Sequence, residues 1–156
     1  MDFTTFIVNE LHILILSAMP IIELRGAIPV AIANGMSPMH AAVISYIGSS
    51  LPVPFLLLWL TPVFNWLRTK KQFAGIVDYV KGRTRRKVKN LRALSMVGLA
   101  LFVAIPLPTT GVWTACVAAS MVNMKFRDGL VSILIGNAMA ALVVTFGSGL
   151  ILALIQ

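Results

Sequence analysis

The chain has little charge for its length. Only 12% of its 156 residues are Asp, Glu, Lys or Arg, whereas 58% are hydrophobic. A soluble domain ordinarily carries about a quarter of charged residues. Because so little charge cannot cover a soluble globule, the composition predicts an integral membrane protein with one compact domain over residues 1–156.

Cysteine is also scarce, and this scarcity excludes several kinds of chemistry. Cys116 is the only cysteine, so an internal disulfide is excluded. The sequence has no Cys/His cluster at metal-ligand spacing, no glycine-rich phosphate loop and no Ser/His/Asp arrangement. We therefore expect a protein that is not an enzyme and that holds no metal or cofactor.

The position of the basic residues explains the net charge of +8. Ten of the 13 basic residues lie in 68–92, between apolar stretches, and Lys125 and Arg127 form a smaller group. Basic clusters beside membrane segments mark the cytoplasmic side. We expect 68–92 and 123–128 to be cytoplasmic in a multi-pass protein of a prokaryotic inner membrane.

The basic segment 68–92 also contains a helical pattern. Phe73, Ile76, Val77 and Val80 have the i, i+3, i+4, i+7 spacing of an amphipathic helix. Such a helix would lie on the inner leaflet, with its basic side chains beside anionic lipid headgroups. The other interpretation is a solvated basic loop that only fixes topology. The segment lacks base-reading chemistry, so we expect no nucleic-acid partner.

Two uncharged stretches, 41–67 and 129–156, are long enough to cross a bilayer, which takes about 20 apolar residues. The stretch 93–124 is also uncharged, but Pro106 and Pro108 interrupt it. Its pieces, 93–105 and 112–122, are too short to cross alone. A re-entrant hairpin, which enters and leaves on one side, would keep both basic groups in the cytoplasm.

The N-terminal part has the same pattern. Residues 3–19 form one arm, 20–25 the break and 26–35 the return arm. The sequence thus predicts an all-α membrane fold of two inverted repeats, 1–67 and 93–156, each a re-entrant hairpin plus one transmembrane helix. A weak ungapped echo pairs 26–36 with 111–121. Such a small fold encloses little, so we expect a homodimer or larger homo-oligomer.

Glu23 and Arg25 fall at the tip of the first hairpin, where ionisable residues are functional candidates. Arg25 could bind an anionic headgroup such as phosphate. Glu23 could instead bind a proton or an organic cation. In the third interpretation the two side chains satisfy each other, or cap the broken helix ends, and touch no substrate.

The second tip is uncharged, with Thr109, Thr110 and Gly111. Their hydroxyls and exposed amides could complete a polar pocket with Glu23, Arg25 and Gly26, and these six residues are the candidate substrate site. Alternatively, the threonines satisfy carbonyls that the nearby prolines leave free.

Other polar residues have two interpretations. Glu10, His12 and His40 could form a proton path with Glu23, or could be solvated at the membrane interface. The small residues of 48–50 and 136–138 predict close helix packing. We also expect Asn137 to hydrogen-bond a neighbouring helix or hairpin.

Three segments carry a resemblance to a known family: PIIELRGAIPVAIANG (20–35), GSSLPVP (48–54) and IPLPTTGVWTACVAASM (105–121). In their order and spacing they resemble the small multidrug export protein family, and the resemblance covers nearly the whole chain. That family usually has glycine where this chain has Thr109. It is distantly similar to the DedA (VTT) superfamily, which implies re-entrant hairpins in inverted repeat and proton-dependent movement of polyprenyl phosphate or phospholipid. The resemblance places the acidic residue of that superfamily at Glu23.

The second motif of the superfamily carries arginines around a proline, and LFVAIPLPTTGVW (101–113) has none. An anion site would then depend on Arg25 and backbone amides. We expect a transporter of an anionic lipid-linked phosphate, with export of small organic cations or a non-transporting scaffold as the alternatives.

Overall fold

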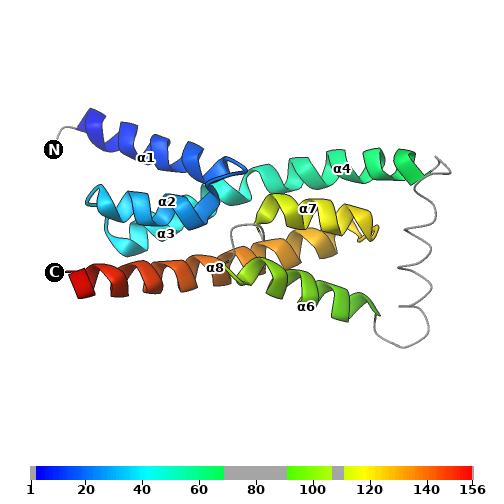
Figure 1. Cartoon of the computed structure of the whole chain (residues 1–156). Helices are drawn as coiled ribbons and strands as arrows, with labels where there is room; N and C mark the ends of the chain where they lie inside the picture. The colour runs from blue at the N-terminus through cyan, green and yellow to red at the C-terminus, as the bar shows by residue number, and fades with distance from the viewer. Residues whose placement is uncertain (1–2, 69–90, 107–110, 156) are drawn as a thin grey trace.

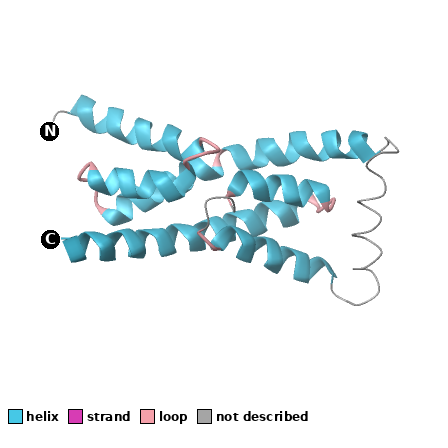
Figure 2. Ribbon diagram, viewed as in Figure 1, coloured by secondary structure: helices cyan, strands magenta, loops and turns pink. Residues whose placement is uncertain are grey.

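The computed structural model describes residues 3–68, 91–106 and 111–155, and the regular structure in them is entirely helical (Figure 2). The predicted all-α class is confirmed. The basic helix predicted over 68–92 lies, apart from its ends, outside the described residues. The helices are α1 (Phe3–Ala18), α2 (Glu23–Ala33), α3 (Pro38–Ser50), α4 (Pro52–Arg68), α6 (Leu91–Ala104), α7 (Val112–Met121) and α8 (Phe126–Ile155).

Two helical hairpins approach each other from opposite ends of the molecule. In the first hairpin, α1 runs to the middle and α2 returns; in the second, α6 runs to the middle from the other end and α7 returns (Figure 1). α3 and α4 follow one another along the molecule, and α8 runs beside them in the opposite direction. The two hairpin turns therefore meet near the centre.

The two long helical stretches correspond to the predicted membrane spans. Pro38–Phe64 and Phe126–Gly149 are long and apolar enough to cross a membrane, with mean hydropathies of 1.8 and 2.1. The first contains the junction of α3 and α4 at Leu51, whose φ of −55° and ψ of −46° remain helical. Pro52 removes one backbone donor at this junction, but the helical stretch continues through it.

Small residues bring the arms of the hairpins close to the long helices. A Cβ at Gly48 would overlap the Leu14 carbonyl of α1, and a Cβ at Gly136 would overlap the Ala100 carbonyl of α6. The close packing predicted at 48–50 and 136–138 is thus confirmed at both glycines. Apolar helices in membranes associate through such small-residue contacts, because lipid supplies no hydrophobic drive between helices.

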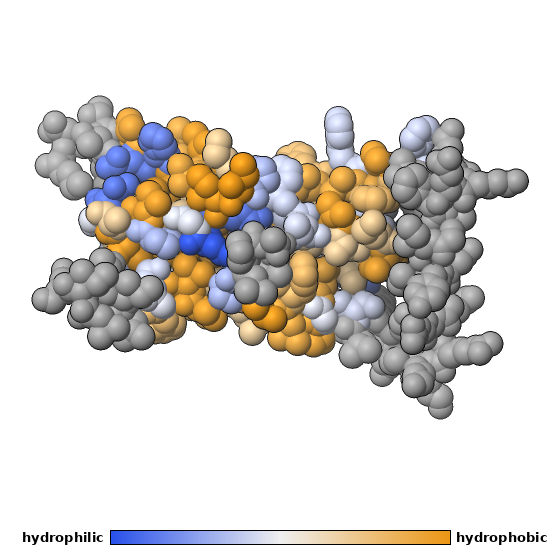
Figure 3. Space-filling view, viewed as in Figure 1, coloured by the Kyte–Doolittle hydropathy of each residue, from blue (hydrophilic) through white to orange (hydrophobic). Residues whose placement is uncertain are grey.

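Large apolar side chains cover much of the outside. Phe55 and Trp59 on α4 and Phe146 on α8 are 67%, 78% and 76% exposed. Figure 3 shows hydrophobic residues over most of the described surface on one face, with hydrophilic residues gathered toward one end and near the middle. So much exposed apolar surface is expected of a protein whose solvent is lipid.

The loops that lead from each hairpin into its long helix have the same backbone geometry. Gly35 and Asn123 have positive φ values of 84° and 56°. Met36 N–H donates to the Ala31 carbonyl, and Met124 N–H donates to the Ala119 carbonyl, at 3.0 and 2.9 Å. This correspondence places Glu23 opposite Gly111. The ungapped echo, which pairs 26–36 with 111–121, differs from this loop correspondence by three residues and rests on only three identical positions.

Candidate functional site

The hairpin turns meet around Glu23, the first residue of α2. Glu23 is only 6% exposed, and its φ is 51°. A left-handed backbone costs a residue with a side chain roughly 1–2 kcal/mol. Strained, buried residues of this kind gather at functional sites, where the surrounding contacts hold them in place.

Glu23 and Arg25 form an ion pair. Arg25 Nη1 donates to Glu23 Oε2 at 2.8 Å, and the two side chains are 13% and 8% exposed. Residues two apart do not face each other on a regular helix. The left-handed backbone at Glu23 departs from the helix and lets them meet.

Arg25 also binds the end of α6 in the second hairpin. Its Nη2 donates to the Val103 carbonyl at 2.7 Å and to the Ile105 carbonyl at 3.3 Å. The last four carbonyls of a helix lack helical partners. The positive guanidinium is therefore placed where the helix dipole is negative, which is stabilising.

Glu23 binds the beginning of α7. Trp113 N–H points at Glu23 Oε1 over a long 3.5 Å, and a Cβ at Gly111 would overlap the carboxylate. Only glycine at position 111 lets the carboxylate come this close. A helix N-terminus attracts anions through its free amides and the positive end of its dipole.

The charged pair of the first hairpin thus caps both broken helix ends of the second, with each charge at the end that its sign suits. Trp113 adds a link in the other direction, since its Nε1 donates to the Ala18 carbonyl of α1 at 3.3 Å. The arrangement joins the two hairpins at the centre of the molecule (Figure 1).

The structure brings Glu23, Arg25 and Gly111 together. Gly26 lies one turn into α2, where a Cβ would be 2.6 Å from Ile22 Cγ2, so close packing with Ile22 explains this glycine. Thr109 and Thr110 lie outside the described residues.

The residues predicted for a proton path lie elsewhere. His40 Nε2 and Glu10 Oε1 are 2.8 Å apart and join α3 to α1, with side chains 38% and 30% exposed. His12 is exposed. Glu10 lies near the middle of α1 and His40 lies at the start of α3, so the pair is away from the turn that holds Glu23.

Sequence reasoning missed the backbone groups of the site, namely the carbonyls of Val103 and Ile105 and the amide of Trp113. A signal for them was present, because Pro106 ends α6 and leaves its last carbonyls without helical donors. Nothing in the sequence indicated that Arg25 would reach them.

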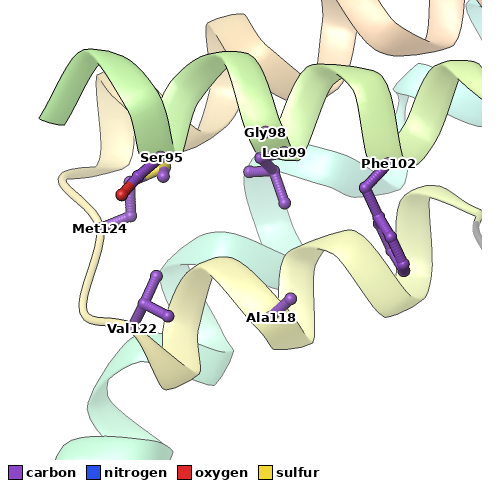
Figure 4. Close-up of a pocket in the computed structure, with 7 residues that line it drawn as sticks. All are labelled: Ser95, Gly98, Leu99, Phe102, Ala118, Val122 and Met124. Atoms are coloured by element: carbon purple, nitrogen blue, oxygen red, sulfur yellow. The ribbon is translucent and has the colours of Figure 1, made fainter. Parts of the chain in front are cut away.

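A shallow apolar pocket of about 270 Å³ lies between the arms of the second hairpin. Figure 4 shows Ser95, Gly98, Leu99 and Phe102 of α6 facing Ala118 of α7 and Val122 and Met124 beyond it. Its lining has no charged side chain. It extends along α6 to Phe102, the residue before Val103 in the chain.

Comparison with protein families identifies the family of this chain. Residues 23–143 match the family described as "Putative small multi-drug export protein". This chain belongs to that family. The matched part contains the charged pair, the second hairpin, the first long apolar stretch and most of the second, and family and apolar helices together place this protein in a membrane. Comparison with the curated proteins and with the solved structures gives no match. The similarity to the DedA superfamily stays a prediction.

Proposed function

We propose that this member of the small multidrug export family is a transporter of amphiphilic anions, such as polyprenyl phosphate or phospholipid, and not an enzyme. The observation that carries the proposal is the position of the Glu23 carboxylate. It lies against the N-terminus of α7 and 2.8 Å from Arg25, as a bound substrate anion would.

The electrostatics of the tips favour a negative group. The guanidinium of Arg25 and the N-terminus of α7 both attract an anion. Glu23 is the anion that the chain itself supplies. When Glu23 takes up a proton, it loses its attraction to both partners, and a substrate phosphate can replace it. Binding of the substrate anion is therefore coupled to protonation of Glu23.

The apolar pocket of the second hairpin supports an amphiphilic substrate. Its lining includes Phe102 of α6, and the carbonyl of the next residue in the chain, Val103, accepts from Arg25. A molecule with its anionic group at Arg25 can lay an apolar chain between α6 and α7. This geometry suits a lipid phosphate, and it equally suits an amphiphilic drug with an acidic group.

The arrangement of the helices supports transport by alternating access. We propose that both hairpins are re-entrant and related as inverted repeats, as in transporters whose broken helices meet at the midplane. The two loop geometries that repeat at Gly35 and Asn123 favour this symmetry. In a prokaryotic inner membrane, rocking one hairpin against the other would break the Arg25 contacts to α6 and expose the site to the opposite side.

The family description favours a second candidate, export of small organic cations. Here Glu23 would be the binding group, and the substrate would displace Arg25 from it. The N-terminus of α7 opposes this, because it adds positive potential at the place where the cation would bind.

Proteoliposomes can separate the two candidates, with a short-chain polyprenyl phosphate as anion and ethidium as cation. We expect the wild type to move the phosphate at a rate that rises with acidity. Arg25→Gln should abolish movement, and Glu23→Gln should retain it without pH dependence. Glu10→Gln, which removes a carboxylate from the half-exposed pair with His40, is the control and should match the wild type.

Two results would count against the anion proposal. Movement of ethidium alone by the wild type would favour the cation candidate. Transport of the phosphate at the wild-type rate by the Glu23→Gln, Arg25→Gln double variant would show that the tips do not hold substrate.

A further inference from the structure

A second buried polar cluster lies between α3 and α8. The side chain of Asn137 is at its centre, on a residue that is 1% exposed. Asn137 Nδ2 donates to Ser49 Oγ at 2.8 Å and to Ser50 Oγ at 3.1 Å. Ser49 Oγ in turn donates to the Tyr46 carbonyl at 3.2 Å. These contacts fix the orientation of the Asn137 carboxamide.

Two oxygens of this region have no hydrogen-bond partner in the described part of the chain. One is Asn137 Oδ1, and the other is Oγ of Ser45, which is fully buried. Ser45 precedes Ser49 by one turn on the same side of α3. Buried polar atoms in proteins are nearly always satisfied, so each of these two oxygens needs a partner such as an ion or an ordered water.

Backbone oxygens are available in the same turn of α3. In a helix, the carbonyls of Gly48 and Ser50 would accept from the amides four residues later. Those positions are Pro52 and Pro54, which have no N–H. The helical stretch Pro38–Phe64 therefore continues through the prolines, while two of its carbonyls lose their helical donors.

The cluster lies at the middle of both apolar spans. Pro38–Phe64 has Leu51 at its centre, and Phe126–Gly149 has Asn137 at its centre. Lipid cannot hydrogen-bond at this depth, and irregular backbone is tolerated there only when protein or a bound group satisfies it. The oxygens thus lie at the depth where transporters bind coupling ions, beside carbonyls that lack helical donors.

We propose that this cluster is a sodium site, formed by Asn137 Oδ1, the hydroxyls of Ser45 and Ser49 or Ser50, and the carbonyls of Gly48 and Ser50. Oxygen-only ligands suit a hard cation. The ligands are all neutral, so they suit a monovalent ion better than Ca²⁺ or Mg²⁺, which need carboxylates. Na⁺ is close in size to Ca²⁺, whose oxygen ligands lie at roughly 2.3–2.6 Å, so it fits a tightly packed cluster better than K⁺. This inference does not depend on which substrate the tips carry.

Thermal unfolding of the purified full chain in detergent tests the site without a transport assay. A ligand that binds only the folded state raises Tm with increasing concentration. We expect NaCl to raise Tm above the values in KCl and choline chloride at equal ionic strength. Asn137→Leu should remove the difference between the salts.

Ser132→Ala is the matched control. Ser132 is also a buried polar residue of α8, at 2% exposure, but its Oγ donates to the Asp128 carbonyl of its own helix at 2.7 Å. This variant should keep the full response to Na⁺. Equal Tm values in the three salts for the wild type would overturn the proposal, as would a Na⁺ response that persists in Asn137→Leu.

A second variant decides the question if Asn137→Leu does not fold. Pro52→Ala supplies the amide that the Gly48 carbonyl lacks, and it changes no side-chain ligand. If that carbonyl binds Na⁺, the concentration for half of the Tm rise should increase about tenfold or more. An unchanged concentration dependence would overturn the proposed ligand set.

Discussion

Replacing Arg25 by glutamine should destabilise the protein more than replacing Glu23 by glutamine. Removing one partner of a buried ion pair costs about 3–5 kcal/mol, because the other charge stays buried without compensation. Arg25→Gln leaves Glu23 in that state and also frees the carbonyls of Val103 and Ile105. Glu23→Gln leaves the guanidinium with those two carbonyls and an amide oxygen, so we expect a cost nearer to about 1–3 kcal/mol.

The double variant shows whether the two charges act together. It leaves neither charge buried, so its cost should be smaller than the sum of the single costs, by about 1–3 kcal/mol. The measurement is the free energy of unfolding of all four proteins in the same bicelles. Single costs that add to the double cost within about 0.5 kcal/mol would refute an energetically coupled pair.

The Glu10–His40 pair supplies a matched control. Its N–O distance is also 2.8 Å, but its side chains are 38% and 30% exposed, against 13% and 8% for Arg25 and Glu23. Exposed pairs contribute about 0–1 kcal/mol, because solvent screens the attraction. A cycle of Glu10→Gln and His40→Gln should therefore give a coupling below about 1 kcal/mol. A coupling as large as that of the buried pair would show that burial is not the cause.

Two glycine substitutions test the packing. Gly111→Ala should lower Tm because a Cβ there overlaps the Glu23 carboxylate. The loss of Tm should be smaller when Glu23 is already replaced by alanine. An equal loss in both backgrounds would contradict this contact. Gly136→Ala should also lower Tm, because its Cβ would overlap the Ala100 carbonyl of α6, whereas Gly98→Ala, with no atom within 4 Å of the new Cβ, should be neutral or gain up to about 1 kcal/mol. A higher Tm for Gly136→Ala than for Gly98→Ala would be the contrary result.

Most of the helices could be predicted from the sequence, because hydrophobic run length and proline position act locally. The interval 93–105 became α6 (Leu91–Ala104) and 112–122 became α7 (Val112–Met121). The prediction for the first return arm was less accurate: it started at 26, whereas α2 starts at Glu23. The charged tip residues lie inside the helix because partners on α6 and α7 hold them there, and local propensity does not contain those partners.

The candidate site was predictable in part. Glu23 and Arg25 marked its position, because ionisable side chains within an apolar membrane segment are energetically costly and usually functional. Three roles remained open, and the structure shows the ion pair and a contact of Arg25 with the end of α6, without deciding whether either side chain also binds substrate. Asn137 was expected to bond a neighbouring helix, and its bonds to Ser49 and Ser50 confirm this.

The sequence alone determined that this protein lies in a membrane, because its apolar composition can be read without a fold. It also determined the family, because the order of motifs along the chain needs no fold to be recognised. Only the tertiary structure decided what Glu23 and Arg25 contact. The carbonyls of Val103 and Ile105 are 78 and 80 residues from Arg25 along the chain. A backbone carbonyl looks the same at every position in a sequence, so its availability to a distant arginine depends on how the two hairpins pack.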